Sequence, residues 1–277
     1  MDQDPWADAE HVAFAHPEVK RARDLLRGSG ADTSTGPYVA VDTIWGHEAV
    51  LAERLRPQLL LVAPEALRDE RARAVAAEVA AVSALVLVLS TRTMQRVANR
   101  DRPDGLVCVV THPVWDPATL PVDGASVLLV ADRVESPGNL GTLLRTLDGC
   151  GGAALVVTDR RASPRSPKAF NASHGMSLSV PQLDFATAGG AAAWLSSRGF
   201  TTYLAEPEGA VGYREPTYAG PTAFVLGSER YGVSADWRAL DLPRVVLPML
   251  GRADSLNVSI AGAVLLYEAR ARKSERA

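Results

Sequence analysis

Short apolar runs alternate along this chain with longer segments of helical periodicity, and this alternation is the feature that most restricts the possible folds. The runs at 58–64, 125–132 and 222–226 have the length of strands, whereas 66–82 and 187–198 have the length and spacing of helices. Strands that alternate with helices are typical of α/β folds with a largely parallel sheet. We therefore predict an α/β architecture.

The segment HPVWDPATLPVDG at 112–124 interrupts the alternation, because it contains three prolines and no periodicity. We predict that it is a linker between a small α/β domain at 1–111 and a larger α/β domain at 125–277. A chain of 277 residues is long enough for two domains.

Composition excludes several classes of protein. The two cysteines, Cys108 and Cys150, lie in apolar or Gly-rich surroundings and indicate neither a disulfide framework nor a thiolate metal site. We expect no metal. The acidic N-terminus MDQDPWADAEH lacks a signal pattern, and charged or polar residues break the longest apolar run, so we expect a cytoplasmic protein without membrane association. A net charge of −3 still permits a local basic face for RNA.

Three Gly-punctuated polar segments, 135–146, 226–234 and 247–259, occur in the second half of the chain. The first two each follow a predicted strand, and the third begins within the apolar run 244–249. Ligands of parallel α/β sheets bind beyond the carboxyl ends of the strands, so the three segments predict one site. Taken singly, each could equally be a capped helix start or an ordinary turn. ESPGNLG at 135–141 lacks the patterns of a dinucleotide-binding loop and of a P-loop.

NLGTLLR at 139–145, GSERYG at 227–232 and LPMLGRADSLNVS at 247–259 together resemble the three motifs of the SpoU/TrmH branch of the SPOUT RNA methyltransferases. The resemblance covers about residues 125–270. PYVAVDTIWG and RPDGLVCVV, in the first domain, resemble the ribosomal-protein-like RNA-binding domain that often precedes it. The resemblance implies a C-terminal domain with a deep trefoil knot, which periodicity cannot predict.

The family resemblance also implies an activity, a cofactor and an assembly. We expect methyl transfer from S-adenosylmethionine to a ribose 2′-hydroxyl of RNA, with large-subunit ribosomal RNA favoured over transfer RNA. The residues do not separate an antibiotic-resistance enzyme from a housekeeping one, and a noncatalytic RNA-binding or ribosome-assembly protein is the alternative. We also expect a homodimer through the knotted domain. An apolar face that would suit either a dimer or an internal core contains Val258, Ala261, Val264, Leu265 and Tyr267.

The resemblance assigns cofactor-binding and catalytic residues. Gly227, Gly232 and Gly251 would let the backbone turn tightly and approach an adenine ring. The expected cofactor-binding residues are Leu226, Gly227, Leu247, Met249 and Leu256. The expected catalytic residues are Arg145, Asn139, Glu229, Ser255 and Asn257.

Arg145 is expected near the N-terminus of its helix, where it would orient the substrate and stabilise negative charge. A guanidinium is too weak a base to accept the proton. We expect Glu229 to orient Arg145 or the loops. His174 stands in a segment where many family members have an arginine, which is a departure from the pattern.

Candidate RNA-binding residues are basic side chains in three parts of the chain, and most such charges are simply solvated. The candidates are Arg21, Arg23, Arg27, Arg92, Arg96, Arg165 and Lys168, with Arg100, Arg102, Arg160 and Arg161 beside them.

Overall fold

A computed structural model describes residues 5–28 and 36–274, so the first four residues of the acidic N-terminal segment lie outside it. The chain divides into two compact units. The first contains Met1–Pro113 and Arg165–Pro167, and the second contains Val114–Pro164 and Lys168–Ala277. Residues 112–125 form turns and irregular structure.

The first unit has a mixed sheet in the order β1-β4-β3-β5-β2, with β5 antiparallel to both of its neighbours. Its strands are β1 (Glu10–His11), β2 (Tyr38–Val41), β3 (Leu59–Val62), β4 (Val86–Val88) and β5 (Leu106–Thr111). Its helices are α1 (Pro17–Arg27), α2 (Ile44–Ala52), α3 (Glu70–Val82) and α4 (Thr91–Ala98), with a 3-10 turn at Pro64–Ala66.

The second unit has a sheet in the order β10-β12-β9-β11-β6-β7-β8, in which every pair of neighbours is parallel. Its strands are β6 (Val127–Asp132), β7 (Leu155–Thr158), β8 (Gln182–Phe185), β9 (Thr201–Ala205), β10 (Val211–Gly212), β11 (Thr222–Leu226) and β12 (Arg244–Val246). Its helices are α5 (Pro137–Gly149), α6 (Pro167–Ser173), α7 (Ala188–Ser197), α8 (Ala235–Arg238) and α9 (Val258–Ser274), with a 3-10 turn at Met176–Leu178.

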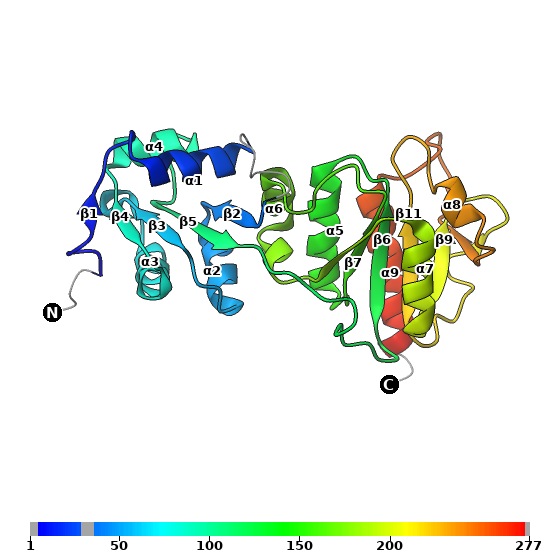
Figure 1. Cartoon of the computed structure of the whole chain (residues 1–277). Helices are drawn as coiled ribbons and strands as arrows, with labels where there is room; N and C mark the ends of the chain where they lie inside the picture. The colour runs from blue at the N-terminus through cyan, green and yellow to red at the C-terminus, as the bar shows by residue number, and fades with distance from the viewer. Residues whose placement is uncertain (1–4, 29–35, 275–277) are drawn as a thin grey trace. The chain divides into compact units, whose positions relative to one another are not determined.

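Helices cover both faces of the second sheet (Figure 1). Alternate residues of a strand point to opposite faces, and β6 shows the result. Leu129 and Ala131 belong to the core under α5 and α9, whereas Leu128 and Val130 belong to the core with α7 and Trp237. Burial on both faces explains why the strands are continuous apolar runs.

Helix α9 returns across the sheet after β12. β12 lies between β9 and β10, yet the next helix packs against α5, β6 and β11. Residues 247–257, which connect β12 to α9, therefore lead the chain back to the middle of the sheet and to the ends of β6 and β11.

The structure confirms the predicted α/β class and differs in detail. The first sheet is mixed, and the short elements β1, β10, α4 and α8 were not expected. α4 was not predicted because its sequence, TRTMQRVA, buries only Met94 and Val97 and so lacks a long apolar pattern. Among the described residues, no helix combines the length and apolarity needed to cross a membrane.

Candidate functional site

Three loops of the second unit follow strands that lie close together in the sheet. Loop 1 (residues 133–136) joins β6 to α5, loop 2 (residues 227–234) joins β11 to α8, and loop 3 (residues 247–257) joins β12 to α9. β6 and β11 are direct neighbours, and β9 separates β11 from β12. Because these strands are parallel, their carboxyl ends bring the three loops to one edge of the sheet.

Glu229 of loop 2 binds loop 1 and the start of α5. Its carboxylate accepts hydrogen bonds from the backbone N–H of Glu135 (3.1 Å) and Ser136 (3.3 Å), and from Nδ2 of Asn139 (2.6 Å). Burial raises the pKa of Glu229, but the N–H donors lower the pKa by more than burial raises it. The pKa of Glu229 is therefore below its ordinary value. Glu229 is thus an anionic acceptor that fixes loop 1 against loop 2.

Asn139 and Asn257 extend this connection to loop 3. Asn257 Nδ2 donates to Asn139 Oδ1 at 3.3 Å. Asn257 Oδ1 accepts from the backbone N–H of Ser259 at 2.9 Å and from its hydroxyl at 2.6 Å, at the N-terminus of α9. Three of the residues predicted to be catalytic, Asn139, Glu229 and Asn257, therefore form one hydrogen-bonded chain across all three loops.

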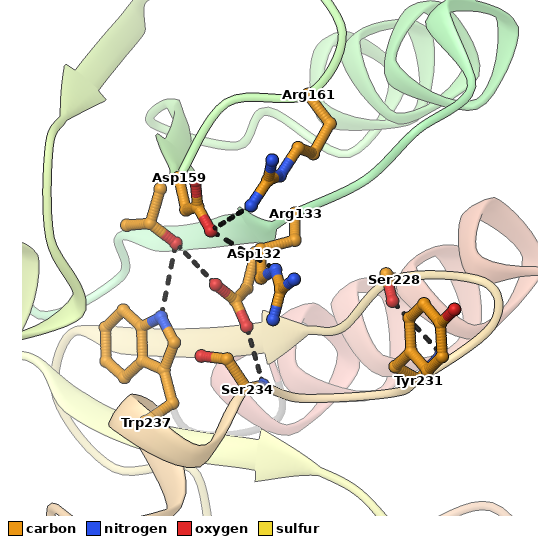
Figure 2. A network of polar contacts seen from close by, with 9 residues as sticks. Asp132, Arg133, Asp159, Arg161, Ser228, Tyr231, Ser234 and Trp237 are labelled. Atoms are coloured by element: carbon orange, nitrogen blue, oxygen red, sulfur yellow. Dashed lines mark hydrogen bonds and ion pairs between the residues drawn. The ribbon is translucent and has the colours of Figure 1, made fainter.

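Asp132, the last residue of β6, makes a second connection between loop 2 and the sheet (Figure 2). Its side chain is buried and accepts from the Thr158 hydroxyl at 3.0 Å and from the backbone N–H of Ser234 at 2.8 Å. Thr158 in turn accepts from Trp237 Nε1 at 3.2 Å. Asp132 was not among the predicted site residues, and its sequence signal is a single acid at the end of an apolar strand.

Two residues beside Asp132 have backbones in the left-handed region, namely Arg133 (φ 57°) and Asp159 (φ 42°). Asp159 Oδ2 pairs with Arg133 Nε at 3.2 Å and with Arg161 Nη2 at 2.9 Å (Figure 2). A positive φ, as in Arg133 and Asp159, is uncommon for residues other than glycine. It turns the chain sharply where β6 and β7 end.

A pocket of about 330 Å³ opens between loop 3 and the ends of β9 and β12. Leu247, Met249 and Leu256, predicted to bind the cofactor, line it together with Ser255, whose hydroxyl donates to Asp254 at 3.0 Å. The other lining residues are Ala205, Glu206, Pro207, Val245, Val246, Pro248, Asp254, Ala261 and Leu265. Apolar walls with a few polar groups, at this volume, are typical of small-molecule sites.

Glu206, directly after β9, is a buried acidic residue that lines the pocket. Its side chain is only 3% exposed and pairs with Arg238 Nε at 2.7 Å and Arg244 Nε at 2.8 Å. Two guanidinium groups compensate one buried carboxylate, as a buried charge requires. Glu206, Arg238 and Arg244 were not among the predicted site residues.

The structure places Leu226 and Gly227 apart from the lining of this pocket. Leu226 is buried in the core beneath α9. A Cβ on Gly227 would lie 1.9 Å from the backbone carbon of Gly232, whose own φ is +67°, so packing within loop 2 already requires a glycine at 227. A Cβ on Gly251 would meet no protein atom within 4 Å.

Arg145 does not lie near the N-terminus of its helix, and that expectation was wrong. α5 begins at Pro137, capped by Ser136, so Arg145 is its ninth residue and lies in its second half. Its Nη1 is 3.2 Å from Nε2 of the exposed His174. The hydrogen bonds of Glu229 go to loop 1 and to Asn139.

The basic residues of α1 differ in the number of ion pairs and hydrogen bonds that they form within the protein. Arg21 pairs with Glu18 at 3.1 Å and donates to Gln58, and Arg23 pairs with Asp24 at 2.6 Å. These contacts compensate their charge within the first unit. Both side chains therefore have structural partners that compete with RNA.

Arg27, Arg92 and Arg96 form the more exposed part of this basic group. Arg96 lies over the Phe14 ring, 3.7 Å from its centroid, and Arg27 donates to the Arg96 carbonyl at 3.3 Å. α1 and α4 thus contact each other, and Arg27 and Arg96 lie where they meet. Arg165 belongs to the first unit, and Lys168 belongs to the second.

Lys168 lies close to the start of α5, because a Cβ on Gly138 would be 3.7 Å from its Cε. Asn139 and the Glu229 contacts are at the same helix end. Within residues 5–28 and 36–274, no three His, Cys, Asp or Glu side chains gather as metal ligands.

Comparison with known proteins agrees with this geometry. Residues 126–267 match the model of the SpoU rRNA Methylase family, which is more than half of the chain. The chain belongs to this family. A protein from Mycolicibacterium smegmatis, named as an uncharacterized tRNA/rRNA methyltransferase, is 31% identical over 95% of the chain and 87% of its own length.

Two further relatives carry more specific names. The 23S rRNA (uridine(2479)-2′-O)-methyltransferase of Streptomyces viridochromogenes is 31% identical over 64% of this chain and 63% of its own length, so the match spans just under two thirds of that protein. The structure of an AdoMet-bound rRNA methyltransferase from Sinorhizobium meliloti has the same fold, with a TM-score of 0.83, 24% identity and coverage of 96% of this chain and 98% of its own.

Proposed function

We propose that this protein methylates a ribose 2′-hydroxyl of RNA with S-adenosylmethionine as the methyl donor. The observation that carries the proposal is the hydrogen-bonded chain Glu229–Asn139–Asn257, which joins three motif loops beside a pocket of about 330 Å³. Membership of the SpoU rRNA Methylase family supports it.

The lining of the pocket suits a nucleoside, because it combines apolar walls with a few polar groups. Leu247, Met249 and Leu256 offer apolar walls for an adenine, while Ser255 and Asp254 offer hydrogen-bonding groups for a ribose. We propose that these residues hold S-adenosylmethionine, together with the backbone near Leu226 and Gly227. When bound, it supplies an electrophilic methyl group on a sulfonium. The S. meliloti relative, whose structure is AdoMet-bound, supports this assignment.

The side chains of the chain orient the acceptor and stabilise charge. Asn139 and Asn257 carry donors and acceptors that suit a ribose hydroxyl, and Glu229 fixes Asn139. A guanidinium is a poor proton acceptor, so Arg145 stabilises a developing alkoxide or a phosphate instead. Its contact with His174 limits the positions that it can reach.

We propose that the first unit binds RNA through Arg27, Arg92 and Arg96 of α1 and α4, with Arg21, Arg23 and Arg165 as further phosphate contacts. Lys168 would be a phosphate contact in the second unit. Phosphate contacts make affinity fall with salt. The double substitution Arg92→Gln and Arg96→Gln should weaken binding and reduce its salt dependence, measured by filter binding between low and moderate salt.

Large-subunit ribosomal RNA is the substrate that we propose, because the S. viridochromogenes relative carries a 23S rRNA name. The enzyme would then act in the cytoplasm, either in resistance to an antibiotic or in housekeeping modification. Testing growth on ribosome-targeting antibiotics with and without the gene separates these two roles.

We also infer a deep trefoil knot and a homodimer, as the family resemblance implies. The return of the chain from β12 to α9, against α5, β6 and β11, supports the knot. An exposed apolar stripe on α9, with Ile260 50% and Tyr267 53% exposed, supports the dimer. Val258 and Leu265, in contrast, belong to the internal core.

The test is incubation of the purified protein with radiolabelled S-adenosylmethionine and, separately, unmodified ribosomal and transfer RNA. Label at one ribose, mapped by nuclease resistance of the methylated linkage, is the expected result. Arg145→Ala should lose this label while binding RNA equally well. Binding of the donor without label on any RNA would favour the noncatalytic RNA-binding or ribosome-assembly function.

A further inference from the structure

Loop 2 is attached to the segment from β6 to α5 at both of its ends. Near its start, Glu229 accepts from the N–H groups of Glu135 and Ser136. At its end, Ser234 donates its backbone N–H to Asp132. In the first attachment, loop 2 supplies the carboxylate of Glu229 and the β6–α5 segment supplies the N–H donors. In the second, the β6–α5 segment supplies the carboxylate of Asp132 and loop 2 supplies the N–H donor.

The interior of loop 2 is fixed by its own backbone. Ser228 and Gly232 exchange two hydrogen bonds of 3.0 Å, and the Ser228 hydroxyl accepts from the N–H of Tyr231 at 3.1 Å (Figure 2). These hydrogen bonds close residues 228–232 into a compact turn within loop 2. Its position relative to α5, and with it the position of Glu229, depends on the attachments at Glu229 and Asp132.

Asp132 is suited to hold loop 2 in place. Its side chain is buried, with the residue 1% exposed, and both hydrogen bonds that it accepts come from uncharged donors, Thr158 and Ser234. A buried carboxylate tolerates little displacement of such donors, because each lost bond leaves charge unsatisfied. The Trp237 indole N–H binds the Thr158 oxygen and so directs the hydroxyl hydrogen toward Asp132.

We propose that Asp132 is a positioning residue for methyl transfer, which fixes loop 2 so that Glu229 can hold Asn139 at the reaction site. This inference rests on the proposed function. Asp132 acts through loop 2 and lies apart from the lining of the cofactor pocket, which is formed by loop 3 and the ends of β9 and β12. Loss of Asp132 should therefore lower kcat by a much larger factor than it raises the Kd for S-adenosylmethionine.

Two substitutions remove this attachment from opposite sides. Asp132→Asn keeps the shape of the side chain but replaces one accepting oxygen with a donating amide. Ser234→Pro removes the donor N–H, and the native φ of −67° already suits proline. Asp236→Asn is the matched control, since it removes one exposed carboxylate two residues after Ser234.

The experiment measures kcat, the KM for RNA, the Kd for S-adenosylmethionine and the hydrogen–deuterium exchange of the loop 2 peptide in each full-length variant. Asp132→Asn and Ser234→Pro should each lower kcat about tenfold or more, as expected when a catalytic group is misplaced by a fraction of an ångström. Loop 2 should exchange faster in both variants. The control should match the parent.

A double-substitution cycle with Glu229→Gln completes the test. If Asp132 and Glu229 act through the same loop, their effects on kcat should fall well short of additive. Parent-like kcat and exchange in both variants, additive losses, or a parallel loss of cofactor binding would each overturn the proposal. A parent that labels no RNA would refute the proposed function instead, and the exchange data would still decide whether Asp132 fixes loop 2.

Discussion

Replacement of Glu229 by Gln tests whether its carboxylate joins the loops. Three donors converge on the two oxygens: the N–H groups of Glu135 and Ser136 and the Asn139 amide at 2.6 Å. The amide of Gln can accept at one oxygen only, so at least one donor would face another donor. A buried charged hydrogen bond contributes about 1.5–3 kcal/mol, but Glu229 is exposed, so we expect a loss of about 1 kcal/mol in unfolding free energy.

The effect should depend on pH with a defined sign. Donation from these N–H groups outweighs burial and lowers the pKa of Glu229 below its ordinary value of 4.5. A lowered pKa stabilises the folded state fully above 4.5, and this stabilisation disappears as the pH falls through the folded-state pKa. The difference between the parent and Glu229→Gln should therefore be present at pH 7 and shrink below about pH 4.

Urea unfolding of both proteins at several pH values measures this difference, with Glu208→Gln as a control for loss of an exposed carboxylate in the same unit. Methyl transfer at pH 7 should fall about tenfold in Glu229→Gln, because Asn139 loses its partner. The reasoning is refuted if the variant is as stable and as active as the parent at pH 7, or if a stability difference persists unchanged in acid.

Three further predictions concern other parts of the chain. Gly227→Ala should destabilise the fold by about 2 kcal/mol or more and abolish activity, because its Cβ would lie 1.9 Å from Gly232 backbone; thermal unfolding and label transfer measure this. Burial lowers the pKa of His47 from 6.5 to about 4. The free energy of unfolding should therefore be at its full value above pH 6.5 and fall by about 3 kcal/mol toward pH 4. Urea titrations of His47→Leu should not show this loss. Ile260→Asp should convert a dimer to monomers in sedimentation velocity, and a monomeric parent would contradict the dimer stripe that Ile260 shares with Tyr267.

The local features of the fold could be predicted from the sequence, because they depend on neighbours along the chain. The apolar run at 125–132 predicts β6 since both of its faces are buried. The position of Arg145 was misjudged, because α5 already begins at Pro137, after the Ser136 cap, and Arg145 is its ninth residue.

The arrangement of the site could be predicted only in part. The family motifs indicated Asn139, Glu229 and Asn257, but not that Glu229 binds backbone N–H groups some 94 residues away. The partners of Asp132 lie 26 and 102 residues away, and the pairing of Arg145 with His174 spans 29. Contacts of this separation are determined by strand order, which periodicity does not encode.

The late position of loop 3 in the chain has a consequence for biosynthesis. The pocket wall from Leu247 to Leu265 follows every strand of the second unit in sequence, and strand β11 inserts beside β6 only after about ninety intervening residues have been made. A ribosome-bound nascent chain therefore cannot form the pocket until α9 has emerged. Capture of the methyl donor should begin only after synthesis of this unit is complete, and donor binding should report its final folding step.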